Sequence, residues 1–270
     1  MTICVGVRVA EGLVLAADSA VSLQGVVDSP QGPQQVLLQT FSYGNKVTRV
    51  KDYPIGVMTW GLASIEARSI QSLIMEFEYS YKSTEDNLGY SVRTVADDLL
   101  SFIRDRYEAA YPTPTDDQGL GLYVGGFSAG EFFSSQYAYQ FPSDTDWTVM
   151  HADREDGNKD FGASWWGLTD PLTRLIRGFS GPSLDELVRR GADQTIVRQW
   201  AEDGASGLPL VFDGMPLQDA VDFAEFAVQV TIGSFRFASG PPLCGGDVDI
   251  AVIRPGTFQW AQRKQWAIKD

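Results

Sequence analysis

The sequence predicts an α+β protein, a four-layer αββα sandwich in which two stacked antiparallel sheets are covered by helices on both outer sides. Three observations indicate it: apolar strand-like runs open the chain, two amphipathic helical stretches follow, and further strands, helices and a final strand complete it. With 270 residues, 44% of them hydrophobic and 21% charged, the chain can bury such a core. We expect a single domain over residues 1–270.

The first quarter of the chain predicts two hairpins. Residues 2–9 and 13–17 are rich in Val, Ile and Leu and are separated by a short turn. Residues 46–50 and 55–60 form a second such pair around a polar turn. The segment between the hairpins, 26–39, is rich in Gly, Pro and Gln, so we expect it to be a loop.

Two helices are predicted next, because the apolar residues now repeat about every 3.6 residues instead of every two. Ser64 is placed as the N-cap of the first helix, and the Pro-containing segment 111–114 ends the second. The predicted buried faces are Ile65, Ile70, Leu73, Ile74 and Phe77 in the first, and Val92, Val95, Leu99, Phe102, Ile103 and Tyr107 in the second.

The rest of the chain is predicted to form further strands, then a helical region, and then a final strand. Asp156 and Gly157 predict a tight hairpin turn between two of these strands. The helical region runs to Phe237, with Pro216 at a first helical position. The predicted strands cover residues 120–126, 137–141, 147–150, 161–164 and 248–253.

Composition excludes several classes of function. The chain has 35 acidic and 21 basic residues, a net charge of -14, which disfavours nucleic acid and anionic membrane surfaces as partners. It has two cysteines, Cys4 and Cys244, and one histidine, His151, too few for a disulfide framework or a clustered zinc site. We expect no metal and no cofactor. Without a membrane-spanning run or a secretory signal, a cytoplasmic protein is expected.

Four short segments near the N-terminus resemble the proteasome β-subunit branch of the N-terminal nucleophile (Ntn) hydrolases in their residues, order and spacing. They are 2–7 (TICVGV), 12–19 (GLVLAADS), 44–47 (GNKV) and 59–62 (TWGL). Residues 124–126 and 244–253 resemble later strands of the same family. Stretches near 24–41 and 179–213 look inserted, which makes the chain similar to the longer bacterial Anbu and β-proteasome-homologue relatives. The implied fold is the Ntn hydrolase fold.

The resemblance implies a nucleophile at Thr2. A small residue after the initiator permits removal of Met1, and the freed α-amine, with an ordinary pKa of ~7.7–8.0, would serve as the general base for the threonine hydroxyl. Lys46 would be the cation beside that hydroxyl, held charged and oriented by Asp18. The backbone N–H of Gly61 would donate to the developing oxyanion.

The resemblance also implies a substrate site and an assembly. Val21, Ser22, Thr59, Trp60 and Ala63 fall where the family binds the substrate backbone and lines its specificity pocket, and bulky Trp60 predicts a narrowed or displaced pocket. The implied protein is a proteasome-like threonine peptidase that cleaves peptide or unfolded-protein substrates inside a homo-oligomer, a ring or a related assembly. Whether an ATPase partner feeds it stays open.

The sequence departs from the family at its supporting residues. Leu168 stands where a serine is usual, with Thr169 as a nearby substitute, and Pro241 stands where an aspartate is usual, with Ser239 nearby. Cys244 occupies the position of another supporting serine. Two alternatives therefore stay open: an Ntn amidase that acts on small amides, and a catalytically impaired scaffold of the same fold.

Three further motifs favour plainer interpretations. Residues 126–130 match the G-x-S-x-G elbow of α/β-hydrolases, but the elbow must lead into a helix and the following residues alternate like a strand. The acidic stretch 153–160 lacks the register of a calcium loop and is expected to be a solvated hairpin. His151 is expected to be a surface or structural histidine, and Trp165 and Trp166 to belong to the core or a subunit interface.

Overall fold

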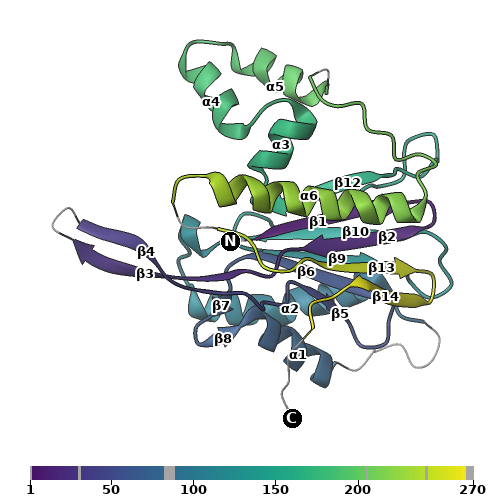
Figure 1. Cartoon of the computed structure of the whole chain (residues 1–270). Helices are drawn as coiled ribbons and strands as arrows, with labels where there is room; N and C mark the ends of the chain where they lie inside the picture. Colours follow the sequence, from purple (N-terminus) through teal and green to yellow (C-terminus); the bar gives the residue numbers. More distant parts are fainter. Residues whose placement is uncertain (1, 30–31, 82–88, 205, 241–242, 266–270) are drawn as a thin grey trace.

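The computed structural model describes residues 2–29, 32–81, 89–204, 206–240 and 243–265, and in this part of the chain two five-stranded antiparallel sheets lie face to face (Figure 1). The first sheet has the order β12 (Gly162–Gly167), β1 (Ile3–Val9), β2 (Gly12–Ala17), β13 (Asp249–Arg254) and β14 (Thr257–Gln262). The second has the order β11 (Thr148–Val149), β10 (Ser135–Phe141), β9 (Leu120–Gly126), β6 (Ile55–Gly61) and β5 (Val47–Arg49).

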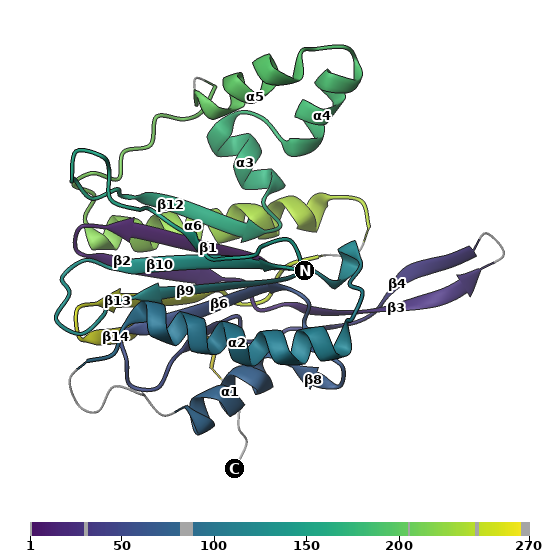
Figure 2. The same ribbon diagram turned by 180° about the vertical axis from the view of Figure 1, so that it is seen from behind.

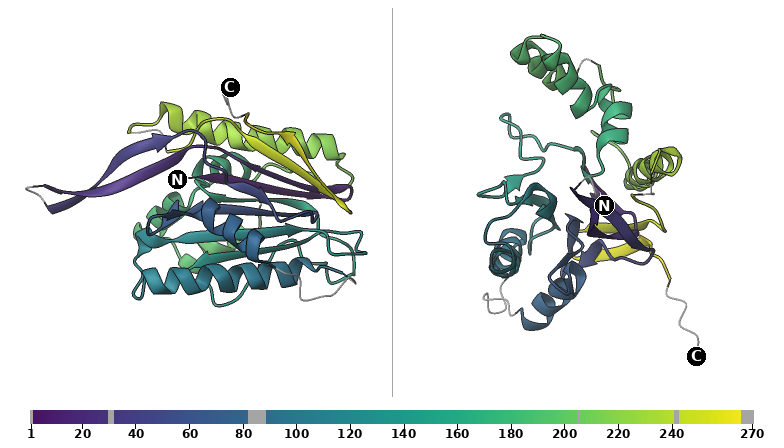
Figure 3. Two further views of the ribbon diagram at one scale, coloured as in Figure 1. Left: turned by 90° about the horizontal axis from the view of Figure 1, so that it is seen from below. Right: turned by 90° about the vertical axis from the view of Figure 1, so that its left-hand side faces the viewer.

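Three apolar clusters separate four layers, which confirms the predicted fold class. The helices α1 (Ile70–Ser80) and α2 (Val92–Ala110) pack on the outer face of the second sheet. The helices α3 (Asp170–Arg177) and α6 (Leu217–Phe237) pack on the outer face of the first sheet. Between the sheets lies a cluster that includes Cys4, Leu15, Met58 and Tyr123. Seen from the side, helices cover both sheets (Figure 3).

The continuous apolar run of β1 follows from this layering. Ile3, Val5 and Val7 pack toward α6, while Cys4 points into the layer between the sheets. A strand covered on both faces needs apolar residues at successive positions rather than alternate ones. The hairpin of β1 and β2 and that of β5 and β6 both form as predicted, and α2, β9, β10 and β13 also match the expected elements.

The expectation of a loop over residues 26–39 is wrong. β3 (Val21–Ser29) and β4 (Gly32–Phe41) form a two-stranded antiparallel hairpin that extends away from the sheets (Figures 1 and 3). A two-stranded hairpin outside the larger sheets needs no alternating apolar pattern, so this segment, rich in Gly, Pro and Gln, carries no strand signal in its sequence.

The expected hairpin around Asp156 and Gly157 is also wrong. β11 pairs with β10 in one sheet and β12 pairs with β1 in the other, so the chain crosses between the sheets here. Two cap assignments shift as well. Ser64 lies in the short strand β7 (Ser64–Ile65), which pairs with β8 (Arg68–Ser69), and the N-cap of α1 is Ser69. Pro216 is the N-cap of α6 rather than its first residue.

The stretch 179–213 contains α4 (Gly181–Arg189) and α5 (Gln194–Glu202), which lie farther from the sheets than α3 and α6 (Figure 2). Neither α4 nor α5 contains a buried residue. Among the helices of the described residues, none combines the length and the apolar character that crossing a bilayer requires.

Candidate active site

Asp18, directly after β2, is the most completely bonded side chain of the site. It is 1% exposed, and its Oδ1 accepts from Lys46 Nζ at 2.6 Å and from the backbone N–H of Ile3 at 3.0 Å. Its Oδ2 accepts from the N–H groups of Ala20 at 3.3 Å and Gly245 at 3.0 Å. Backbone donors on both oxygens hold the carboxylate in place, so Lys46 Nζ has a fixed partner.

Thr2 lies just before β1, where its backbone is held from two sides. The next N–H, that of Ile3, bonds to Asp18, and the Thr2 carbonyl accepts from Leu168 N–H at 2.7 Å. Gly167 has a φ of +85°, and a Cβ there would lie 2.0 Å from the Thr2 carbonyl oxygen. Only glycine lets β12 pass this close, so Gly167 and Leu168 fix the position of Thr2.

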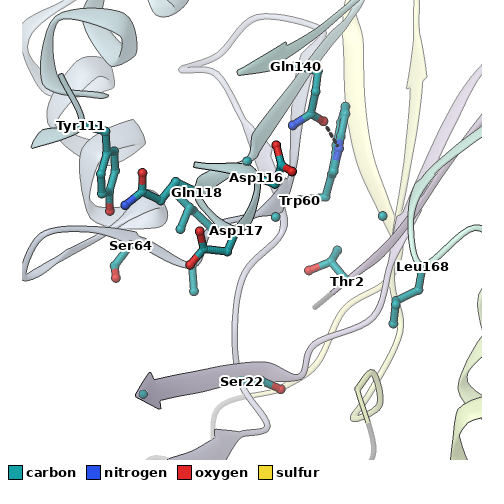
Figure 4. Close-up of a pocket in the computed structure, with 16 residues that line it drawn as sticks. Thr2, Ser22, Trp60, Ser64, Tyr111, Asp116, Asp117, Gln118, Gln140 and Leu168 are labelled. Carbon is teal, nitrogen blue, oxygen red and sulfur yellow. Dashed lines mark hydrogen bonds between the residues drawn. The ribbon is translucent and has the colours of Figure 1, made fainter. Parts of the chain in front are cut away.

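Two adjoining cavities meet at Thr2, one of about 620 Å³ and one of about 260 Å³. Asp116 and Asp117 of the short helix η1 (Asp116–Gln118) form the wall of the larger cavity opposite Thr2. The Thr2 side chain points into the cavity, toward η1 (Figure 4). The smaller reaches Lys46. Both are lined by Thr2, Ser22, Trp60, Gly61, Leu62 and Ala63, and the smaller also by Val21 and Thr59.

The residues that the sequence singled out therefore come together around one place. Thr2, Lys46, Gly61 and the five expected substrate-binding residues all line the cavities, and Asp18 lies behind Lys46. The lining also includes residues that sequence reasoning missed. In the larger cavity they are Gly25, Ser64, Tyr111, Asp116, Asp117, Gln118, Gly119, Gln140 and Gly167.

Gly61 ends β6 in a conformation that only glycine adopts readily. Its φ is +86°, and a Cβ would lie 2.2 Å from the carbonyl oxygen of Gly119. That oxygen accepts from the N–H of Leu62 at 2.9 Å, which fixes the peptide after Gly61. The backbone at Gly61 thus reaches the wall of both cavities without a side chain in the way.

Trp60 forms a wall of the cavities and does not fill them. Its indole Nε1 donates to Gln140 Oε1 at 2.8 Å, and its ring stacks on Trp166 with centroids 5.3 Å apart. A Cβ on Gly121 would lie 1.8 Å from the indole, so this glycine makes room for the ring. The side chain is 8% exposed and belongs to the cluster between the sheets.

Both cysteines are buried near this site and are protonated at neutral pH. Burial raises the pKa of the Cys244 thiol to about 12, with a further increase from the Asp18 carboxylate and an opposing effect of Lys46. Burial also raises the pKa of Cys4, whose Sγ donates to the Thr59 carbonyl at 3.5 Å. Neither thiol is a thiolate nucleophile at neutral pH.

Thr169 and Ser239, the nearby substitutes for the family's supporting residues, lie outside the two cavities at Thr2. Thr169 lines a different cavity, and Ser239 is exposed and outside both cavities at Thr2. Pro241 and Met1 lie outside the described residues. Leu168 has no hydroxyl to offer, but its backbone N–H holds the carbonyl of Thr2.

The G-x-S-x-G motif at 126–130 is structural. The Ser128 hydroxyl accepts from the backbone N–H of Val92 at 3.1 Å, at the start of α2. The chain then enters β10 and not a helix, so no nucleophile elbow forms.

No protein-family model matches the sequence, and no curated protein does either. Solved structures do match. One is Anbu (ancestral beta-subunit) from Yersinia bercovieri, with a TM-score of 0.53, 15% identity and coverage of 96% of this chain and 86% of that chain. Another is an Anbu (Gly-1) mutant from Hyphomicrobium sp. strain MC1, with a TM-score of 0.49, 14% identity and coverage of 98% and 86%.

At 15% identity the similarity shows the fold and nothing finer. The resemblance inferred from short segments of sequence is thereby confirmed at that level. This chain has the fold of Anbu, an ancestral beta-subunit.

Proposed function

We propose that this chain is a threonine-type amide hydrolase that cleaves peptide bonds with Thr2 as its nucleophile after removal of Met1. The observation that carries the proposal is the convergence on one pair of cavities of Thr2, the buried Lys46–Asp18 pair and the left-handed Gly61. Each feature alone has a structural explanation. Together they supply a nucleophile, a fixed positive charge and an oxyanion donor.

In the reaction, the freed α-amine of Thr2 takes the hydroxyl proton as Oγ attacks the carbonyl carbon of the substrate. The Lys46 ammonium stabilises the negative charge that develops on Oγ, and Asp18 keeps that ammonium in place. The backbone N–H of Gly61 donates to the oxyanion. The α-amine then protonates the leaving amine, and water hydrolyses the acyl-enzyme by the reverse proton transfers.

The shape of the site favours a peptide over a small amide. Two cavities of about 620 and 260 Å³ adjoin at Thr2 and share six residues of their walls, so an extended chain can occupy both. Ser22 and Val21 at the start of β3 and Thr59 and Ala63 around Gly61 are proposed to bind its backbone and side chains. We also propose that the protein acts as a homo-oligomer on peptide or unfolded-protein substrates.

A fusion with a cleavable N-terminal partner tests this function directly. The chain is released so that it begins at Thr2, and hydrolysis of fluorogenic peptide amides of increasing length is measured before and after release. We expect activity to appear only after release, because an acylated α-amine is no base. Thr2→Ala should lower the rate about 10³-fold or more, while Thr2→Ser should retain activity.

Several outcomes would count against the proposal. Equal activity before and after release would remove the α-amine from the mechanism. Activity confined to short acyl amides would favour the small-amide hydrolase over the peptidase. A released, folded chain that is inactive on every substrate would favour a scaffold. Light scattering on the same sample measures the assembly, and a monomer would contradict the proposed oligomer.

A further inference from the structure

His151, the only histidine of the chain, lies between an aspartate and a serine. Its Nδ1 is 3.0 Å from Asp160 Oδ2, and its Nε2 is 3.1 Å from Ser164 Oγ. His151 follows β11 in one sheet, while Ser164 lies on β12 at the edge of the other. The contact therefore forms only in the folded protein, which explains why spacing along the sequence does not reveal it.

The hydrogen-bond partners of His151 indicate which of its ring nitrogens carries a proton and which one accepts. Burial raises the pKa of Asp160, but hydrogen bonds from His151 and Arg154 outweigh it and lower that pKa below its usual value. The ionised carboxylate can only accept, so Nδ1 of His151 carries the proton it donates. In the neutral imidazole Nε2 is then the acceptor, and the Ser164 hydroxyl donates to it. This is the arrangement that activates a serine.

The surrounding residues hold this arrangement in place. Arg8, which is 4% exposed, donates from Nη1 to the carbonyl oxygens of His151 and, at 3.2 Å, Asp160. Arg154 Nε donates to the other carboxylate oxygen of Asp160 at 3.2 Å. A Cβ on Gly162 would lie 2.7 Å from the imidazole, so glycine is required for the ring to sit there. His151 itself has a φ of +49°, a conformation that tertiary contacts must maintain.

A cavity of about 340 Å³ opens at Ser164 on the free edge of β12. The register pairs Ser164 with Gly6, and the N–H of Leu168 bonds to the carbonyl of Thr2. Even-numbered residues of β12 therefore direct their backbone groups toward β1, and odd-numbered ones toward the free edge. The N–H of Trp165, directly after the serine, is thus available at the edge as an oxyanion donor.

Arg177 lines the same cavity and indicates the class of substrate. It is exposed, its guanidinium lies 5.7 Å from the centre of the Trp165 ring, and within the described ranges no carboxylate lies within 4.0 Å of it. A guanidinium without a carboxylate partner, beside a candidate nucleophile, suits a substrate that carries its own carboxylate.

We propose that Ser164 is a second nucleophile, independent of Thr2, which hydrolyses esters whose acyl chain carries a carboxylate. Ser164 Oγ bonds to the ester carbonyl carbon while its proton passes to His151 Nε2. The ester C–O bond then breaks, and the leaving alcohol takes the proton from Nε2. Water repeats the two steps and releases the carboxylic acid and the free serine. Asp160 is a positioning residue that orients the imidazole.

A fluorophosphonate probe tests the nucleophile without a known substrate. The full-length chain is labelled and digested, and the modified residue is identified by mass spectrometry. We expect one label on Ser164, unchanged in Thr2→Ala and absent in Ser164→Ala. His151→Gln should slow labelling about 10²-fold or more because the general base is lost, with circular dichroism showing that the variant is folded. Ser128→Ala, which removes a hydroxyl outside the cluster, should label like the wild type.

Two outcomes would overturn the proposal. If Ser164 stays unlabelled in the folded wild-type protein, its hydrogen bond with His151 serves only to hold β12 against the segment that follows β11. Labelling that is as fast in folded His151→Gln as in the wild type would show that the imidazole does not activate the serine.

A pair of matched esters tests the substrate class. The mono-4-nitrophenyl ester of adipic acid and 4-nitrophenyl hexanoate differ by the terminal carboxylate. We expect kcat/KM to favour the adipate, and Arg177→Gln to lower that preference about two- to fivefold, as for a solvent-exposed ion pair. An equal preference in the wild type and Arg177→Gln would contradict the assignment of Arg177. Loss of hydrolysis in Thr2→Ala but not in Ser164→Ala would assign the esterase activity to Thr2 instead.

Discussion

Two buried ion pairs of the same type lie among the residues that the structure describes, and only one of them belongs to the candidate active site. Asp18 pairs with Lys46 at 2.6 Å, and Asp249 pairs with Lys264. All four side chains are at most 6% exposed. Lys46 lines a cavity together with Thr2, whereas Lys264 Nζ donates to the carbonyl of Gly44 at 3.0 Å.

The difference shows that burial and pairing alone do not identify a catalytic charge. Asp249 also accepts from the backbone N–H of Lys264 at 3.0 Å, so this pair fastens the segment after β14 to β13. The pair of Asp18 and Lys46 is equally structural in its bonds, but Lys46 also lines the smaller cavity at Thr2. The position of Lys46 in the wall of that cavity is what distinguishes the two pairs.

Matched substitutions separate the two roles. Asp18→Asn and Asp249→Asn each leave a lysine buried without its counter-ion, so each should lower the free energy of unfolding by about 3–5 kcal/mol. Only Asp18→Asn should also abolish peptide hydrolysis, because Lys46 is no longer held. Urea unfolding and kcat per folded molecule measure the two effects. An unchanged kcat per folded molecule in Asp18→Asn would show that the pair at Asp18 acts only through stability.

Gly61 can be compared with Gly130 in the same way. Both have positive φ values, +86° and +78°, but only at Gly61 would a Cβ meet a backbone atom. Gly130→Ala should cost about 1–2 kcal/mol from the left-handed conformation. Gly61→Ala adds the steric overlap with Gly119 and should cost about 2–5 kcal/mol in total, with loss of hydrolysis. Similar costs for the two variants, measured by urea unfolding, would contradict the close approach at Gly61.

Substitution of Ser22 tests whether the walls of the cavities at Thr2 bind substrate. In the described part of the chain its buried hydroxyl has no hydrogen-bond partner, and neither has that of Thr40, the residue opposite it in the hairpin. Ser22→Ala and Thr40→Val should therefore leave stability nearly unchanged. Only Ser22 lines the cavities, so only Ser22→Ala should raise KM for peptides, by up to about tenfold for one lost hydrogen bond. An unchanged KM would remove Ser22 from the substrate site.

The two thiols should show the smallest effect, which is no reaction in the folded protein. At about pH 8 a thiol reagent should leave Cys4 and Cys244 unmodified and react with both after unfolding. The unfolded thiol of Cys244 loses its proton near pH 9.0 and the folded one near pH 12. The folded state keeps the proton between these values, so this residue contributes stability that is lost as pH rises through that window. Rapid modification of the native protein would contradict its burial.

Much of the fold follows from the sequence because burial leaves a pattern in it. A strand covered on both faces is apolar at successive positions, and a helix covered on one face has an apolar stripe. β1, β2, β9 and α2 have the apolar patterns that such burial demands. The hairpin of β3 and β4 has no such pattern, because it lies outside the layers. β11 and β12 join different sheets, a choice made by tertiary pairing that a local turn signal does not reveal.

The same distinction applies to the site. Thr2, Asp18, Lys46 and Gly61 lie within four short segments near the N-terminus, so a resemblance in sequence was enough to group them. The residues that complete the cavity wall come from η1, β10 and the end of β12, and no local pattern connects them. The cluster around His151 likewise depends on a contact between two sheets.

The intact mass of the purified protein, before and after incubation with a peptide epoxyketone, tests the central claim most directly. An epoxyketone reacts with both the hydroxyl and the free amine of an N-terminal threonine: Oγ adds to the ketone and the amine opens the epoxide. We predict a chain that lacks Met1 and gains one inhibitor, and a Thr2→Ala variant that gains none. A chain that retains Met1 and gains no inhibitor would contradict the assignment of Thr2 as an N-terminal nucleophile.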